Sequence, residues 1–317
     1  MENKKKLVCL LLCLLPVITF AQFKTATSYA LIKRVIPARA SSFIVEELPA
    51  AAAKDVFEVE SSKGKIILRG NNGVAVASAL YHYLTEYAHC QITWNGTNLN
   101  IPAVLPVVKE KVHKKTPYEY RYYLNYCTYN YSMSWWDWKR WEKEIDWMAL
   151  HGINMPLALT GQEYTWYEVY KEMGFTDKDL STFFSGPAFF GWFWMGNLDG
   201  WGGPLPLSWM TSHRDLQQQI LKRERELGMK PVLQSFTGHV PSAFKQRFPA
   251  SKLKQTNWRN GFDDTYILDT EDPMFEEIGK KFLQVQTKLY GTDHLYSADT
   301  FNENEPPTDD PAYLSAL

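Results

Sequence analysis

The sequence predicts an α/β protein, in which a small N-terminal α/β domain is followed by the first half of a (β/α)8 TIM-type barrel. From about Thr116, amphipathic helical stretches alternate with short apolar stretches, and a glycine separates each helix from the next strand. Polar side chains follow these strands, where barrel enzymes build their sites. A doubly wound sheet is the alternative, but no glycine-rich nucleotide turn follows the first strand.

Composition limits the class of protein. The 317 residues are 45% apolar and 22% charged, which excludes a disordered chain and a multi-span membrane protein. The 34 basic and 35 acidic side chains give a net charge of −1, so no basic excess supports nucleic-acid binding. Ten of the twelve Trp lie between Trp135 and Trp209, a density that core filling alone does not explain.

Residues 1–21 are predicted to be a signal peptide. Three lysines, Lys4 to Lys6, precede the apolar run 7–20, and Ala21 is a small residue at the expected cleavage point. The run is too short to span a membrane, and no other stretch is long and apolar enough to do so. We therefore expect a secreted or periplasmic protein after cleavage.

Residues 22–115 are expected to form the small N-terminal α/β domain and a linker. The stretches 43–45 and 65–68 are short, rich in branched side chains and bounded by polar residues, as strands are. The segment 70–73 reads as a turn that opens a helix, because its glycine spacing fits neither nucleotide-binding motif. The basic run 109–115 is expected to be linker.

Residues 116–317 are predicted to be the N-terminal part of the barrel, and the barrel is expected to be incomplete. We expect a first strand at 122–128, followed by three units of one helix and one strand each. The first helix is capped by Ser134 with Asp137 and ended by Gly152, before strand 153–159; the second is capped by Ser212 with Asp215 and ended by Gly228, before strand 229–236. The third is capped by Asp272 and ended by Gly291, before strand 295–301. A full barrel needs ~250 residues. We therefore expect the chain to be the front part of a longer protein.

The cysteines and histidines predict neither a disulfide framework nor a metal centre. Only Cys90 and Cys127 remain after the signal peptide, and two unpaired thiols are favoured over a single bridge. No His or Cys spacing suggests zinc, so we expect no metal and no cofactor.

The run 299–303, Asp-Thr-Phe-Asn-Glu, is the main candidate for chemistry. Glu303 follows a strand and can point into the barrel mouth, where burial among aromatic side chains would keep a carboxyl protonated for donation to a leaving oxygen. Asn302 can bind a sugar hydroxyl, and Asp299 lies at the same strand end. The alternative is a solvated glutamate in an acidic loop.

Other strand ends offer binding residues, each with a plainer alternative. Trp136 and Trp201 can stack on a sugar ring or merely pack loops together. Gln162 can bond hydroxyls. Glu163 can be a charge partner of the site or can favour the helix dipole from a first turn. His239 can contact substrate or be structural.

Three aromatic-rich runs, 124–128, 135–138 and 141–150, resemble the α-N-acetylglucosaminidases of glycoside hydrolase family 89. Further matching runs are 160–163, 184–189, 195–198, 202–206, 236–241, 291–294 and 298–303, followed by Pro306 and Pro307. The resemblance spans nearly all of 116–317 in one order. Residues 23–110 look like that family's small N-terminal domain.

The resemblance implies an exo-acting retaining hydrolase that removes terminal α-linked N-acetylglucosamine from glycans, with Glu303 as general acid/base. The substrate-binding residues expected with it are Asn125, Trp136, Gln162, Glu163, Asn197, Trp201, His239, Asp299 and Asn302. Family members use a second glutamate on a late strand as nucleophile, and this sequence has no counterpart of it. Activity of this chain alone is therefore not expected. The alternatives are a non-catalytic carbohydrate-binding fragment and an exo-hexosaminidase of other specificity.

Overall fold

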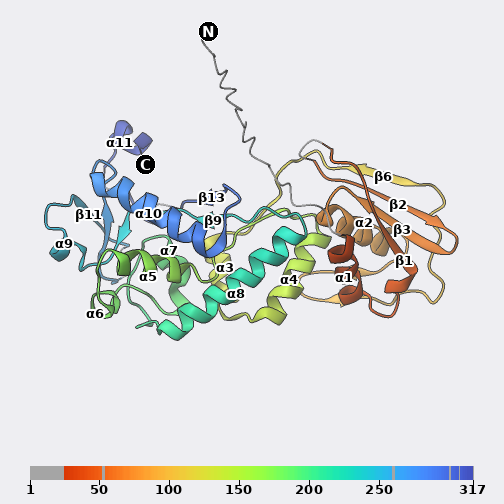
Figure 1. Ribbon diagram of the computed structural model, residues 1–317, viewed down its shortest axis with the longest axis horizontal. Helices are drawn as coiled ribbons and strands as arrows, with labels where there is room; N and C mark the ends of the chain where they lie inside the picture. The colour runs from red at the N-terminus through yellow and green to blue at the C-terminus, as the bar shows by residue number, and fades with distance from the viewer. Residues whose placement is uncertain (1–24, 52–53, 259–260, 300, 307, 317) are drawn as a thin grey trace, which may run out of the picture.

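The computed structural model describes residues 25–51, 54–258, 261–299, 301–306 and 308–316. It confirms the α/β class: a sheet domain at one end adjoins a longer body of helices around short parallel strands (Figure 1). The predicted signal peptide lies outside the described residues. In the described part of the chain, no helix is long and apolar enough to cross a membrane.

The N-terminal domain is a four-stranded sheet covered by two helices. Its strands, in sheet order, are β1 (Phe43–Glu47), β3 (Lys65–Gly70), β2 (Val56–Ser62) and β6 (Val112–Lys115), and its helices are α1 (Thr25–Val35) and α2 (Gly73–Glu86). The strands expected at 43–45 and 65–68 are confirmed and pair in parallel. The expected linker is partly wrong, because its residues 112–115 pair with β2 as an edge strand.

The turn before α2 joins the small domain to the barrel. Asn72 caps α2 by accepting a hydrogen bond from the backbone N–H of Ala75 at 2.8 Å. The N–H of Val74 donates to the carbonyl of Leu227 at 2.9 Å. A Cβ on Gly73 would lie 2.7 Å from that same oxygen, so only glycine permits this approach.

Four short parallel strands form the barrel portion in the predicted chain order. They are β7 (Tyr122–Tyr123), β8 (Met155–Pro156), β9 (Leu233–Gln234) and β13 (Tyr296–Ser297). β7 pairs with β8 and β9 pairs with β13, while a parallel bridge from Leu157 to Val232 joins the two pairs. The described residues therefore contain half of an eight-stranded barrel, as predicted.

Three crossover helices connect these strands: α4 (Trp138–Leu150), α8 (Leu207–Glu226) and α10 (Pro273–Tyr290). The predicted terminators Gly152, Gly228 and Gly291 follow them with φ of +75°, +85° and +70°. The cap Asp272 is also confirmed.

Two predicted caps are wrong, and each predicted strand is longer than the observed one. Strands 122–128, 153–159 and 229–236 shorten to 122–123, 155–156 and 233–234, and the described part of 295–301 shortens to 296–297. Asp137, not Ser134, caps α4, because its own carboxylate accepts the N–H of Arg140 at 2.8 Å. Ser212 lies inside α8, which begins five residues earlier at Leu207. The first strand stops at Tyr123, since Asn125 caps a helix there.

The remaining elements include two insertions that the strand pattern did not predict. Before α8 lie α5 (Gln162–Glu172), α6 (Asp177–Leu180), η3 (Pro187–Phe189) and α7 (Phe190–Trp194); before α10 lie α9 (Phe244–Arg247) and an antiparallel sheet of β10 (His239–Val240), β12 (Thr265–Leu268) and β11 (Leu253–Thr256). Shorter pieces are η1 (Ala40–Ser42), β4 (Gln91–Ile92), β5 (Thr97–Asn98), α3 (Tyr126–Ser132), η2 (Met133–Trp135) and α11 (Pro311–Ala316).

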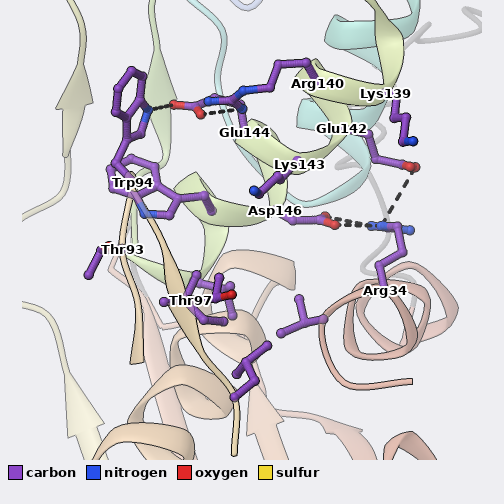
Figure 2. Close-up of a pocket in the computed structure, with 15 residues that line it drawn as sticks. Arg34, Thr93, Trp94, Thr97, Lys139, Arg140, Glu142, Lys143, Glu144 and Asp146 are labelled. Carbon is purple, nitrogen blue, oxygen red and sulfur yellow. Dashed lines mark hydrogen bonds and ion pairs between the residues drawn. The ribbon is translucent and has the colours of Figure 1, made fainter. Parts of the chain in front are cut away.

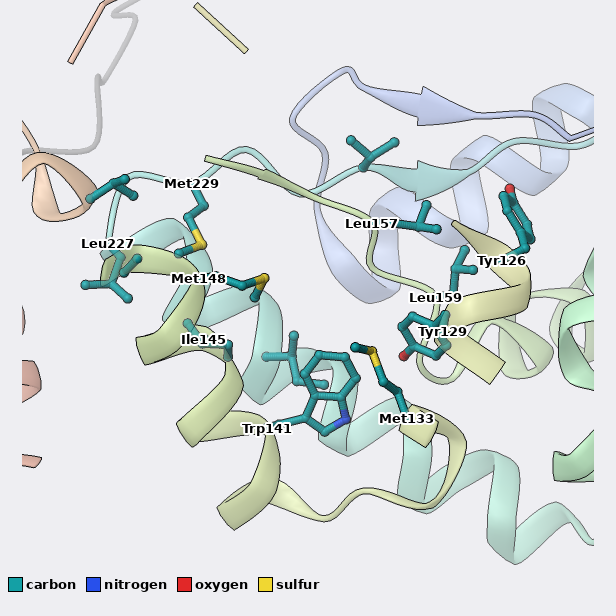
Figure 3. Packing of buried hydrophobic residues seen from close by; sticks show 14 of the residues in the cluster. Tyr126, Tyr129, Met133, Trp141, Ile145, Met148, Leu157, Leu159, Leu227 and Met229 are labelled. Carbon is teal, nitrogen blue, oxygen red and sulfur yellow. The ribbon is translucent and has the colours of Figure 1, made fainter. Parts of the chain in front are cut away.

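The core is aromatic and continuous from the sheet domain into the barrel. Figure 3 shows Trp141, Ile145 and Met148 of α4 directed toward the chain that bears Leu157 and Leu159. All five side chains are at most 3% exposed. This apolar face of an amphipathic helix therefore packs α4 onto the barrel.

Candidate active site

The loop after β13 holds the candidate acid/base. Glu303 is exposed, and the indole N–H of Trp258 donates to its Oε2 at 3.1 Å. Phe301 and Glu303 both have φ of +61°, a left-handed conformation that costs non-glycine residues roughly 1–2 kcal/mol each. Strain of this kind persists only where surrounding contacts hold it, and it is concentrated at functional sites.

Asn197 supplies the contacts on both sides of Glu303. Its side chain is fully buried, and its Nδ2 donates to the carbonyl of Asn302 at 2.9 Å. Its Oδ1 accepts from Nδ2 of Asn304 at 2.7 Å. Asn302 in turn donates to the two carboxylate oxygens of Asp299 at 3.1 and 2.9 Å. One buried amide therefore grips the loop immediately before and after the candidate acid.

Aromatic rings lie beside this loop, and we call Phe189, Trp192, Trp201, Trp258 and Phe262 the aromatic belt. Ring centroids are 5.9 Å apart for Trp192 and Trp258, 4.9 Å for Trp258 and Phe262, and 4.4 Å for Phe262 and Trp201. Phe189 closes the series at 6.1 Å from Trp201. Trp201 is 41% exposed, so the belt offers an open indole near the loop.

The first strand end reaches the same place. Burial, and after it the charges of Glu303 and Asp299, raises the pKa of the Cys127 thiol, so this half-buried side chain lies near both carboxylates. Asn125 is two residues away and exposed, but its Oδ1 caps α3 by accepting the N–H of Thr128 at 2.8 Å. The structure therefore brings Asn197, Asp299, Asn302 and Glu303 into one loop cluster, whereas the side chain of Asn125 serves as the cap of α3; the sugar-binding roles of these residues stay predictions.

The described contacts of Trp136 are with α4 and Trp94 and not with the Glu303 loop, so its role in stacking on a sugar stays a prediction. The guanidinium of Arg140 lies 3.7 Å from the Trp136 ring, and the ring packs edge-on against Trp141 at 5.2 Å and near Trp94 at 6.4 Å. These contacts are those of the plainer alternative, loop packing. The physical reason is the helix start at Trp138, which turns residue 136 toward α4.

Gln162, Glu163 and His239 are fully buried, so the expectation of direct sugar contact does not hold for them. His239 Nε2 lies 2.7 Å from Asp199 Oδ1, and its ring packs against Phe183 at 4.9 Å. Gln162 accepts a long hydrogen bond of 3.4 Å from Gln286. Burial raises the pKa of Glu163 to about 7. It lies in the first turn of α5, as its plainer alternative predicted.

The burial expected around Glu303 is also absent, because its side chain is exposed and the belt lies beside it. Sequence reasoning missed Trp258, Asn304 and Trp192. One signal was present: Trp258 is one of two tryptophans outside the dense 135–209 cluster. The antiparallel insertion carries it to the loop, and strand patterns did not reveal that insertion.

A hollow of about 410 Å³ lies between the sheet domain and α4 (Figure 2). Its buried acids are paired: Arg34 donates to Asp146 at 2.6 and 2.7 Å, and Glu144 accepts from Trp94 and Arg140 at 3.0 Å. Burial is the main influence on Asp146 and raises its pKa. We interpret these paired side chains as a structural contact between the sheet domain and α4. Among the described residues, no group of three or more His, Cys, Asp or Glu could hold a metal ion. Cys90 and Cys127 are free thiols.

Comparisons with known proteins place both parts of the chain. Residues 121–317 match the family model "Alpha-N-acetylglucosaminidase (NAGLU) tim-barrel domain", and residues 26–107 match the corresponding N-terminal domain. Human alpha-N-acetylglucosaminidase is 44% identical over 302 residues, which is 92% of this chain and 41% of the human protein. The chain therefore spans less than half the length of this relative.

Solved structures of a family 89 glycoside hydrolase from Clostridium perfringens have the same fold. Its complex with 2-acetamido-1,2-dideoxynojirmycin superimposes with a TM-score of 0.85 at 37% identity, covering 90% of this chain and 33% of that one. A form with two glutamates replaced by glutamine, bound to its substrate GlcNAc-alpha-1,4-galactose, gives 0.84 at 36% identity, covering 90% and 34%.

Proposed function

Because the chain belongs to the alpha-N-acetylglucosaminidase family, glycoside hydrolase family 89, we propose that it carries the acid/base part of a site that removes terminal α-linked N-acetylglucosamine. The observation that carries the proposal is Glu303, bound by Trp258 and bracketed by Asn197 at the end of a barrel strand. A relative with this fold binds a GlcNAc-α-1,4-galactose substrate after two glutamates are replaced. We propose that Glu303 corresponds to one of these.

The proposed chemistry is acid/base catalysis in a retaining mechanism. The protonated Glu303 donates its proton to the glycosidic oxygen as that oxygen leaves the anomeric carbon, and a carboxylate on the opposite face forms the glycosyl ester. Glu303, now ionised, then takes a proton from water as the water oxygen displaces the ester. Trp258 fixes one carboxylate oxygen of Glu303, which orients the carboxyl for both transfers.

A second carboxylate must lie about 5–5.5 Å from the first. Two described strand-end carboxyls do not fit this role. Asp299 receives two hydrogen bonds from Asn302 in the same loop, and Glu163 is fully buried. We therefore propose that the described residues provide the acid/base and much of the sugar pocket, while the nucleophile is another carboxyl.

The first experiment separates hydrolysis from binding. Release of p-nitrophenol from the α-GlcNAc aryl glycoside is measured for the chain and for E303Q, with the β-anomer as the control for linkage. Any α-specific release should fall by more than ~100-fold in E303Q, the size typical of general acid/base catalysis. Equal and measurable α-specific release by both proteins refutes the acid/base role, whereas no release by either protein leaves the binding titration to test the site.

The second experiment tests the carbohydrate-binding alternative, which the unsuited Asp299 and Glu163 favour for the chain on its own. Free N-acetylglucosamine is titrated while tryptophan fluorescence is followed, because Trp258 donates to Glu303 and packs, through Phe262, in one belt with Trp201. We expect a saturable change that weakens in W258F and persists in E303Q. A linear, non-saturating response argues against a sugar pocket.

We also propose that the protein is exported. The support is the basic head and apolar run of residues 4–20, ahead of Ala21. N-terminal sequencing of the protein from the medium or periplasm should begin at Gln22. Recovery from the cytoplasm with the first 21 residues intact contradicts this.

A further inference from the structure

Glu163 is a buried carboxyl that the proposed chemistry does not use. It lies in the first turn of α5, after the N-cap Gly161, is fully buried, and accepts the indole N–H of Trp194 on Oε1 at 2.6 Å. Its Oε2 has no hydrogen-bond partner among the described groups. A carboxyl placed in the core at such a desolvation cost needs a reason beyond filling space.

The partner Trp194 is the last residue of α7, a helix of five residues. Its carbonyl accepts a hydrogen bond from Gln234 of β9 at 2.8 Å, and its ring packs edge-on against Tyr129 of α3 at 5.5 Å. Trp194 is therefore fixed from three directions, by β8–α5, β9 and α3. The bond to Glu163 is the one that holds its indole N–H.

Helix α7 and the turn that follows it make two connections toward Glu303. Two residues before Trp194, the Trp192 ring lies 5.9 Å from Trp258, whose indole donates to Glu303. Three residues after it, Asn197 grips the loop on both sides of Glu303. The intervening Gly196 carbonyl accepts from Thr265 at 2.5 Å, so this turn is held rigidly.

We propose that Glu163 is a positioning residue: by holding the Trp194 indole it sets the place of α7, and α7 aligns Glu303 through Trp192–Trp258 and through Asn197. The inference rests on the proposed function only for the role of Glu303. The alignment of α7 with the Glu303 loop is a property of the protein without bound sugar. Glu163 touches neither sugar nor reacting atoms, since no part of it reaches the surface.

An acceptor oxygen is the feature that this role requires. Glutamine keeps such an oxygen, whereas leucine fills similar space without one. Burial raises the pKa of Glu163 to about 7, so a neutral carboxyl is well populated near neutrality and glutamine imitates it. Rescue by E163Q but not by E163L therefore separates hydrogen bonding from packing.

The test reads the site without any turnover. The full chain is labelled with 15N in tryptophan indoles and asparagine side chains, and two signals are followed: the Trp258 indole N–H, assigned by W258F, and the Asn197 amide pair, assigned by N197D. We expect both to move by more than a linewidth in E163L and to keep their positions in E163Q. W194F removes the other end of the bond and should reproduce the E163L displacement.

Glu224 is the matched control. It is 1% exposed, has one oxygen without a described partner, and lies on α8 with no bond to α7. E224L should leave the Trp258 and Asn197 signals in place. The inference is overturned if E163L leaves both signals in place, if E163Q moves them as far as E163L does, or if E224L moves them equally. If E163L does not fold, W194F against E163Q decides in the same way.

The binding titration then keeps the two proposals apart. E163L should weaken N-acetylglucosamine binding by about tenfold, the effect expected if the displaced loop loses one hydrogen bond to the sugar. If the signals move as expected but no protein binds sugar, the positioning role stands and the proposed function fails. If sugar binds and the signals do not respond to E163L, the positioning role fails alone.

Discussion

Replacing Asn197 by alanine tests the grip on the acid/base loop. The substitution removes the bonds of 2.9 Å to Asn302 and 2.7 Å from Asn304. Each is worth ~1 kcal/mol net, and since residues 302 and 304 are only half-buried their stranded groups regain some water. The expected loss is therefore ~2 kcal/mol. The two left-handed residues of the loop hold roughly 2–4 kcal/mol of strain, so a loss of this size lets the backbone relax.

The assay is urea unfolding followed by tryptophan fluorescence, with the Trp258 indole signal as the local probe. N197A should lower the midpoint without changing the slope, and should displace the Trp258 signal. N100A, at an exposed asparagine, is the control and should change stability by less than ~0.5 kcal/mol. A loss below ~0.5 kcal/mol in N197A, with the Trp258 signal in place, refutes the reasoning.

Three further predictions concern buried groups. Burial raises the pKa of Glu163 from 4.5 to about 7, so its contribution to stability is complete below pH 4.5 and is lost as pH rises through 7. Urea unfolding from pH 4 to 8 should show a fall that E163Q lessens by up to ~1.4 kcal/mol per pH unit; parallel curves contradict this. R34M strands the buried Asp146 carboxylate and should cost ~3–5 kcal/mol, whereas the R34M/D146L double variant should recover most of that loss in thermal unfolding. G161A should cost over ~3 kcal/mol, because φ is +69° and a Cβ would lie 2.6 Å from a backbone oxygen; G64A, with φ of +75° and open space, should cost only ~1 kcal/mol, and equal losses argue against the clash.

The barrel order was predictable because each crossover helix carries its own signals. Asp272 with Pro273 begins α10, and Gly291 ends it, so chain-local chemistry fixes both limits. The strand ends were less predictable. The run 122–128 is apolar enough for one strand, yet Asn125 captures the N–H of Thr128 and starts a helix. Local side-chain competition decided the outcome there.

The site was predictable where a residue stands at a strand end and its partners are near in the chain. Asp299 and Asn302 meet this condition, and Glu303 follows them directly in the same loop. Trp258 does not, since an antiparallel insertion brings it from 45 residues away to donate to Glu303. Strand-end position suggested site roles for Glu163 and His239, each with a structural alternative, whereas tertiary packing buries both completely. Depth below the barrel mouth is not encoded in sequence spacing.

The approach of Gly73 to Leu227 bears on how the molecule comes apart. The N–H of Val74 uses the Leu227 carbonyl at the end of α8, so the sheet domain completes a helix terminus that belongs to the barrel. Detaching the domain would leave that carbonyl without its hydrogen bond from Val74. We expect the two parts to unfold together in one calorimetric peak. We also expect proteases not to cleave the folded protein between the sheet domain and the barrel portion.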